Sequence, residues 1–207
     1  VRSDLVAVYI WSVYTECMHG MPSERPVRVA VPVNLRPYFN SITTKNFFVM
    51  VSAEFHPTKE IYTFEEVLKS VSGSLRSQIN RENLEKLFSY NVSNEKLLAA
   101  RIVPLFLKNL AMRYVYTTSA LANTATVTNI GNISVSEEYR PYVEMFHAFL
   151  AMSKGQHLKG TICSYGDTLV FSFSYDLVDA SVQRGFFRKI ASDGIAVEIK
   201  SNGVNYE

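Results

Sequence analysis

Cysteine is scarce in this sequence, with only two in 207 residues. Cys17 and Cys163 lie far apart in apolar surroundings, and neither belongs to a CxxC pair or to a cluster of histidines. This pattern argues against a zinc site and against a disulfide framework. Because paired cysteines are typical of oxidising compartments, we expect a reduced, cytoplasmic location.

Long apolar runs and an excess of charge of one sign are also lacking. No run reaches the length of a membrane span, and residues 1–20 lack the basic head, apolar core and small-residue cleavage site of a signal peptide. The 21 basic and 19 acidic residues leave a formal charge of +2, and the basic residues are scattered. We therefore expect neither a membrane span nor a nucleic-acid partner. The first residue is Val1 rather than Met, as in a fragment, a processed chain or an excised domain.

The composition is that of a chain able to fold around a core. Hydrophobic residues make up 47% of the sequence and aromatic residues 13%. There is no disordered or collagen-like bias, and no internal repeat or low-complexity linker is present. One or two compact units are expected.

Hydrophobic periodicity predicts both helices and strands. In the first part of the chain we expect a helix over 4–19, strands over 27–35 and 46–55, and a helix over 63–79. A helical stretch over 94–114, broken near Pro104, is expected next. The last part is expected to contain strands over 124–131, 142–152, 158–165 and 168–175, a last helix opened by Asp179 or Ser181, and a closing strand over 195–199. Thr63 and Glu66 form a capping box, and Gly166-Asp167 is a two-residue hairpin turn. The prediction is an α/β or α+β fold with a mixed β-sheet flanked by helices.

The segment VPVNLRPYF at residues 31–39 contains the end of a buried strand followed by a charged residue. Valine at every second position from 27 to 33 is the period of a half-buried strand, and Pro32 limits how its backbone can pair. Arg36 therefore lies just after the end of a strand, where loops commonly carry function.

Three short motifs resemble a known family through their order and spacing. The motif PVNLR at 32–36 is similar to a Pro-Val-x-x-Arg strand end, TNIGN at 128–132 to a Ser/Thr-Asn-x-Gly turn, and residues 160–176 to a late hairpin ending in an aromatic-Asp step. These are features of chloramphenicol-acetyltransferase-like acyltransferases, which include alcohol acetyltransferases, wax-ester synthases and the condensation domains of peptide synthetases. The resemblance covers essentially the whole chain. The local sequence is most similar to that of bacterial alcohol acetyltransferase-like proteins. It implies that residues 1–207 are the carboxy-terminal lobe of a two-lobed acyltransferase.

The catalytic motif of that family, His-His-x-x-x-Asp-Gly, is absent from this chain. The resemblance implies that an amino-terminal lobe carries it and that its second histidine is the general base. None of the four histidines here is adjacent to another or is followed by the required Asp-Gly. The expectation is that no catalytic residue lies in this chain and that the chain alone is inactive.

The resemblance gives Arg36 a supporting role. It would pair with the aspartate of the absent motif, because a planar guanidinium bonds a carboxylate through two hydrogen bonds. Asn34 and Asn46 would steady the strand ends around it. The simpler alternatives are that Arg36 is a solvated residue after a strand and that the two asparagines form turns.

The resemblance also places three residues along the tunnel between the lobes. Thr126, Thr128 and Asn129 would line it and offer donors near the thioester oxygen, where an oxyanion-like charge develops. The alternative is that the threonines are ordinary strand formers and that Asn129, before Gly131, is a turn residue.

Other polar residues have simpler explanations than catalysis. His147, in the expected strand over 142–152, is predicted to be a core or edge histidine, and His157 a solvated loop residue. Asp176 and Asp179 resemble a carboxylate pair for acid/base work, but a helix cap and a turn are favoured.

The function expected from the resemblance is acyl transfer from a coenzyme A thioester, or a carrier-protein thioester, to an alcohol or amine. No tightly bound cofactor and no metal is expected. Lys45, Lys154 and Lys159 would contact the phosphates of coenzyme A, or be ordinary solvated lysines. The expected partners are the missing amino-terminal lobe and the substrates, with self-association through an uncovered interface. The alternative is a non-catalytic binding or assembly module with the same half-fold, favoured by the missing motif and the aromatic surplus.

Overall fold

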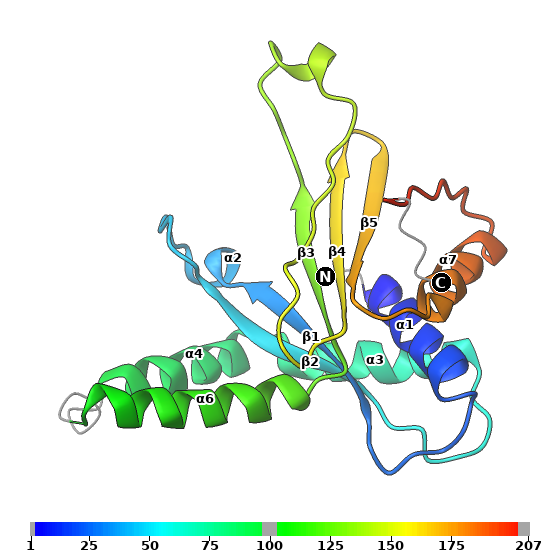
Figure 1. The fold of residues 1–207 in the computed structure, drawn as a ribbon. Coiled ribbons are helices and arrows are strands. Elements are labelled where there is room, and N and C mark those ends of the chain that lie inside the picture. The colour runs from blue at the N-terminus through cyan, green and yellow to red at the C-terminus, as the bar shows by residue number, and fades with distance from the viewer. Residues whose placement is uncertain (1–2, 97–102, 203–207) are drawn as a thin grey trace.

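The computed structural model describes residues 3–96 and 103–202, and Figure 1 shows their arrangement. Its centre is one five-stranded sheet in the order β2-β1-β3-β4-β5. The strands are β1 Val27–Asn34, β2 Phe48–Phe55, β3 Ala125–Asn132, β4 Leu158–Tyr165 and β5 Thr168–Tyr175. The β1/β2 and β4/β5 pairs are antiparallel, whereas β1/β3 and β3/β4 are parallel. The predicted mixed sheet flanked by helices is confirmed.

Three helices cover one face of the sheet and enclose the core. They are α1 Ser3–Ser12, which continues as a π-helix over Val13–Cys17, α3 Phe64–Gln78 and α7 Ser181–Ser192. The alternating valines of β1 all lie in this core, which accounts for the period of two in the sequence. The partly buried Phe171 packs against the buried Phe186 with the rings tilted and their centroids 4.3 Å apart.

An extended segment, residues 143–153, crosses the opposite face of the sheet over β4, and we call it the strap. It returns from a 3₁₀ turn, Arg140–Tyr142, which projects beyond the ends of β3 and β4 (Figure 1). The strand predicted over 142–152 is wrong, because this segment crosses the sheet instead of lying beside a strand. Side chains of β4, rather than a backbone ladder, bind its carbonyl groups.

Two further helices, α4 Arg81–Lys96 and α6 Leu105–Leu121, run side by side away from the sheet (Figure 1). Pro104 directly precedes α6, so the predicted break there is confirmed, but α4 begins well before the expected residue 94. A short helix, α2 Arg36–Phe39, follows β1.

The closing strand predicted over 195–199 is also wrong in this structure. After α7 the chain turns at Gly194, whose φ of +83° favours glycine, and residues 195–202 belong to no strand.

Candidate functional site

Arg36 lies where β1 ends and α2 begins, and its side chain turns back over the following loop. Its Nε donates to the carbonyl oxygen of Thr43 at 3.0 Å, and its Nη2 donates to the carbonyl oxygen of Lys45 at 2.7 Å. Its Nη1 donates to Oδ1 of Asn34 at 3.3 Å, and the same oxygen accepts from the Arg36 backbone N–H at 3.1 Å. The guanidinium is therefore held in one orientation.

The positive charge of Arg36 has no acidic partner within the described residues. Each of its three acceptors is an uncharged oxygen. A guanidinium has five N–H protons, so these bonds leave one on each terminal nitrogen. The side chain is only partly buried.

The two predicted supporting asparagines differ in their surroundings. Asn34 bonds Arg36 directly, as described. Asn46 is exposed, and its side chain has no hydrogen-bond partner among the residues that the structure describes. The structure thus brings Asn34 and Arg36 together and leaves Asn46 apart.

The three predicted tunnel residues lie on β3. Thr126 and Thr128 alternate with the core residues Ala125 and Val127 and therefore occupy the face opposite the helices. Oδ1 of Asn129 accepts from the Gly131 N–H at 2.9 Å, where the pairing of β3 with β4 shifts register. Asn129 thus has the turn geometry that its sequence also favoured.

Arg36 and the β3 residues are on strands that separate. Residue pairing between β1 and β3 is confined to Val29 with Ala125 and Ala30 with Thr126. Beyond these pairs the two strands diverge (Figure 1). Within the described residues, no hydrogen bond or ion pair joins Arg36 to Thr128 or Asn129.

The prediction that Lys159 is a solvated lysine is wrong, because Lys159 is buried. It is 7% exposed, and its Nζ donates to the carbonyl oxygen of Ala151 at 2.7 Å and to Oγ of Ser153 at 2.8 Å. It lies beside Thr126 on the sheet face that the strap crosses. Its signal in the sequence is that it interrupts an otherwise uncharged strand. Lys45 and Lys154 are exposed, as expected of solvated lysines.

Cys163 is a second anchor of the strap. Its Sγ lies 3.2 Å from the carbonyl oxygen of Phe146, and the Phe146 ring packs edge-on against Tyr165. The thiol is 1% exposed, and burial raises its pKa. A thiol with a raised pKa is a weak nucleophile, so Cys163 has a packing role.

The histidine and aspartate predictions have mixed outcomes. His147 is exposed and stacks on Phe149, so its predicted core or edge-strand position is wrong. His157 is exposed, as expected, but its Nδ1 lies 3.0 Å from Oδ1 of Asp176. Asp179 accepts from the Ser181 hydroxyl and backbone N–H, which lowers the pKa of its carboxyl group. These bonds form the predicted turn directly before α7, whose N-cap residue is Ala180.

Metal-ligating side chains do not gather in residues 3–96 and 103–202, where no group of three or more His, Cys, Asp or Glu is placed to hold an ion. Over the same residues, no helix is long and apolar enough to cross a membrane.

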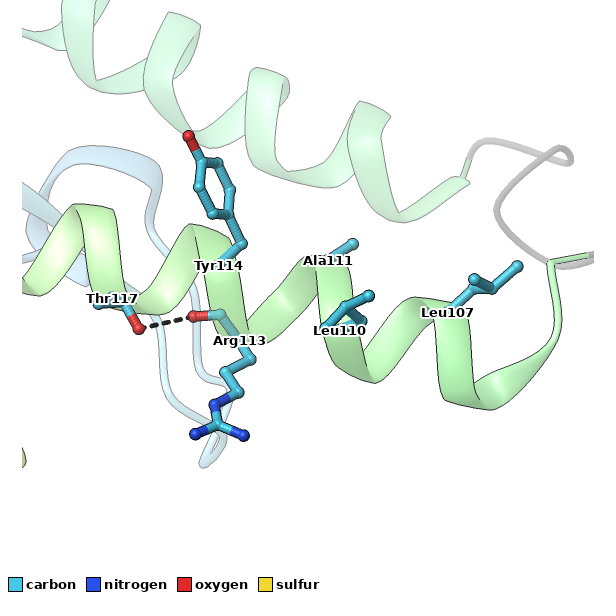
Figure 2. A pocket seen from close by; sticks show the side chains of 6 residues that line it. All are labelled: Leu107, Leu110, Ala111, Arg113, Tyr114 and Thr117. Carbon is cyan, nitrogen blue, oxygen red and sulfur yellow. Dashed lines mark hydrogen bonds between the residues drawn. The ribbon is translucent and has the colours of Figure 1, made fainter.

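Helix α6 exposes an unusual amount of apolar surface. Eight of its large apolar or aromatic side chains are between 45% and 72% exposed: Leu105, Phe106, Leu107, Leu110, Met112, Tyr114, Val115 and Tyr116. Several line a pocket of about 600 Å³, in which the Tyr114 ring points toward the neighbouring helix and Arg113 away from it (Figure 2). The helix contains no acidic residue. Exposed apolar surface of this extent commonly marks a site of protein association.

Comparison with known proteins gives little further information. No family model matches the chain, and no curated protein matches it. One similar solved structure is described as "Molecular basis for condensation domain-mediated chain release from the enacyloxin polyketide synthase". The similarity has a TM-score of 0.45 and 11% sequence identity, and it covers 98% of this chain and 38% of that chain. This chain spans less than half the length of that one, and similarity at this level does not establish a family.

Proposed function

We propose that this chain is the carboxy-terminal lobe of a two-lobed acyltransferase that supports a general base carried by the other lobe. The observation that carries the proposal is the guanidinium of Arg36. It is fixed by Asn34, Thr43 and Lys45, yet it has no acidic partner within the described residues. An arginine held in this way is preorganised for a carboxylate on another surface.

The exposed surface of α6 supports the same proposal. Contiguous apolar patches on a protein surface commonly mark sites of protein association. A second lobe that covered α6 would bury side chains such as Leu110 and Tyr114, now 67% and 72% exposed. In the two-lobed protein, Arg36 then has a carboxylate partner and the apolar surface of α6 has a protein surface to pack against.

The proposed reaction is acyl transfer from a thioester to an alcohol or amine. A histidine of the other lobe removes the proton of the acceptor group as that group attacks the thioester carbonyl carbon. The tetrahedral intermediate then collapses, the carbon–sulfur bond breaks, and the thiolate takes up the proton. No covalent enzyme intermediate is required. Arg36 binds the aspartate of the motif and thereby helps to hold the histidine in place. It is therefore a positioning residue.

The other residues have subsidiary places in this proposal. Thr126, Thr128 and Asn129 form part of the tunnel wall, and Asn34 and Asn46 belong to the support around Arg36. The donor is acyl-coenzyme A or an acyl carrier protein, bound as a substrate rather than as a resident cofactor. The cytoplasmic location expected from the two thiols is part of the same proposal.

A reconstitution experiment tests the proposal. The coding sequence upstream of Val1 is first read for the motif His-His-x-x-x-Asp-Gly, and the polypeptide that contains it is expressed with this chain. We expect thiol release from acetyl-coenzyme A with an alcohol acceptor only when both parts are present. Turnover by this chain alone, undiminished when the histidines of the added part are substituted, contradicts the proposal.

The alternative function is a binding or assembly module without chemistry, favoured by the exposed surface of α6 alone. It predicts that the upstream sequence lacks the motif. It also predicts that Leu110→Asp abolishes association with a partner while no acyl transfer is detected in any combination. The two functions thus differ in a measurable product.

A further inference from the structure

Helix α6 is anchored differently from α4, the helix beside it. Leu84 of α4 lies in the hydrophobic core, and Phe88 packs edge-on against Phe47 with the ring centroids 5.3 Å apart. None of the described side chains of α6 belongs to that core. The two helices run side by side (Figure 1), yet only α4 is packed against the body of the protein. Helix α6 therefore lacks the packing partner that α4 has.

One row of residues on α6 has the spacing of a helix-packing surface, and we call this row the seam. It consists of Leu107, Leu110, Tyr114 and Thr117, which follow one another at intervals of three, four and three residues. All four line the pocket described above (Figure 2). The Thr117 hydroxyl donates to the carbonyl oxygen of Arg113 at 2.9 Å, so it can be covered without losing its partner. The seam is suited to a helix that lies along α6.

The charges beside the seam are all of one sign. Helix α6 carries Lys108 and Arg113 and no acidic residue. Within the described residues, neither cation forms an ion pair. Arg113 directly precedes Tyr114 of the seam and points away from α4 (Figure 2), which is the flanking position that selects the charge of a partner helix. On α4, by contrast, Nζ of Lys86 lies 2.6 Å from a carboxylate oxygen of Glu82.

A second copy of α6 does not meet these requirements. It would bring a matching seam, but it would also bring Lys108 and Arg113 and no carboxylate. Like charges that flank a seam oppose pairing, whereas opposite charges favour it. The complementary partner is therefore a helix of different sequence, with acidic residues beside its apolar side.

We propose that the seam of α6 binds an acidic amphipathic helix of the missing lobe. This inference rests on the proposed function, because that function supplies the lobe that carries the helix. Apolar side chains of the helix cover the seam, and its carboxylates lie beside Arg113 and Lys108. The apolar contact provides most of the attraction, and the charges select the partner. Together with α4 and α6, the bound helix forms a three-helix bundle.

Two synthetic peptides of about three heptads test this role on the 207-residue chain. Both have leucine at heptad positions a and d, but one carries glutamate and the other lysine at positions e and g. We expect the glutamate peptide to bind at least about fivefold more tightly, because its carboxylates attract the two cations that the lysines repel. Fluorescence anisotropy of the labelled peptides measures both affinities, and added salt should narrow the difference.

Matched substitutions locate the binding on the helix. Leu110→Gln should weaken binding of both peptides by at least about tenfold, whereas Met112→Gln, at a similarly exposed residue on the opposite side of α6, should not. Arg113→Gln should remove much of the preference for the glutamate peptide. Lys69→Gln, an equal loss of charge at an exposed residue of α3, should leave that preference unchanged. Unfolding in urea checks that each variant is folded.

Three results overturn the proposal. The first is equal binding of the two peptides, or binding of neither. The second is displacement of the glutamate peptide by vesicles that contain an anionic phospholipid, which would make α6 a membrane-binding surface. The third is self-association of the chain that Leu110→Gln abolishes, which would make a second copy the occupant of the seam.

The reconstituted protein separates this proposal from the proposed function. Leu110→Gln should weaken the association of this chain with the polypeptide that carries the motif, and Met112→Gln should not. Thiol release that requires both parts, combined with association that is unaffected by Leu110→Gln, would leave the proposed function standing and overturn the role of the seam. Selective peptide binding without thiol release in any combination would instead remove the proposed function, and with it the assignment of the helix to the missing lobe.

Discussion

Nη2 of Arg36 donates a hydrogen bond of 2.7 Å to the backbone carbonyl oxygen of Lys45. Together with the bond from Nε to Thr43, it fastens residues 40–47 to the end of β1. Removing these bonds with Arg36→Ala should destabilise the protein by about 2 kcal/mol, given the usual net value of a hydrogen bond. Urea unfolding measures this change, and limited proteolysis should show cleavage within 40–47. Arg25→Ala, at an exposed arginine, is the control and should change neither.

Gly160 is required because a side chain there has no room. A Cβ at this position would lie 2.8 Å from Cζ of Phe171 and 3.2 Å from Cγ2 of Val127. Phe171 cannot move away easily, since it packs against Phe186. Gly160→Ala should therefore lower the free energy of unfolding by about 1–3 kcal/mol.

The matched control for Gly160 is Gly73, in the middle of α3. A Cβ there meets nothing within 4 Å. Gly73→Ala should raise the free energy of unfolding by about 0.5–1 kcal/mol, because alanine favours the helix. Equal effects of the two substitutions in urea unfolding would contradict the packing described around β4.

Lys159 should control how tightly the strap lies on β4. Lys159→Met keeps the length of the side chain but removes the bonds to Ala151 and Ser153. Losing about 2 kcal/mol of bonding corresponds to about 30-fold more frequent opening. The reaction of Cys163 with a thiol reagent reports this opening, because the strap covers that thiol. A Cys17→Ser background removes the exposed thiol.

The control for Lys159→Met is Lys154→Met, since Lys154 is exposed and carries the same charge. It should leave the reaction rate of Cys163 unchanged. If Lys159→Met also leaves the rate unchanged, the strap is held by other contacts.

The start of α3 should respond to acid. Glu66 accepts from Lys59 and from the backbone N–H of Thr63, and these bonds lower the pKa of its carboxyl group below the ordinary value of 4.5. A lowered pKa in the folded state means that the stabilisation is present above pH 4.5 and is lost as the pH falls through the folded-state value. The urea midpoint should therefore fall less between pH 6 and pH 3 in Glu66→Gln than in the unmodified protein.

Two further variants separate charge from capping at this helix. Glu65→Gln removes a carboxylate in the same turn without changing the capping box, so the acid response of Glu66 should persist. Thr63→Ala removes the hydroxyl that accepts from the Glu66 N–H and should cost about 1 kcal/mol at neutral pH. An identical acid response in all variants would contradict the role assigned to Glu66.

Local patterns predicted much of this fold. The alternating valines of β1, the capping box at Thr63 and the turn at Gly166-Asp167 each depend on neighbours in sequence, and each is present in the structure. The strap could not be predicted in this way. Residues 143–153 have strand-like composition, but contacts with β4, remote in sequence, decide where they lie.

The candidate site was predicted only in part. The sequence places Arg36 at a strand end, but its bonds to the carbonyl groups of Thr43 and Lys45 depend on the path of the intervening loop, which no short pattern specifies. The burial of Lys159 likewise depends on the strap. The roles assigned to Asn46, Thr126 and Thr128 stay predictions.

The most direct test of the central claim is the kcat of the reconstituted two-lobed protein carrying Arg36→Ala, measured across pH with Arg25→Ala as the control. The loss of a positioning contact should lower kcat by about 100-fold while the ionisation of the base remains visible in the pH profile, because the base itself is still present. Wild-type kcat in Arg36→Ala would contradict the claim that this chain positions a base on another lobe.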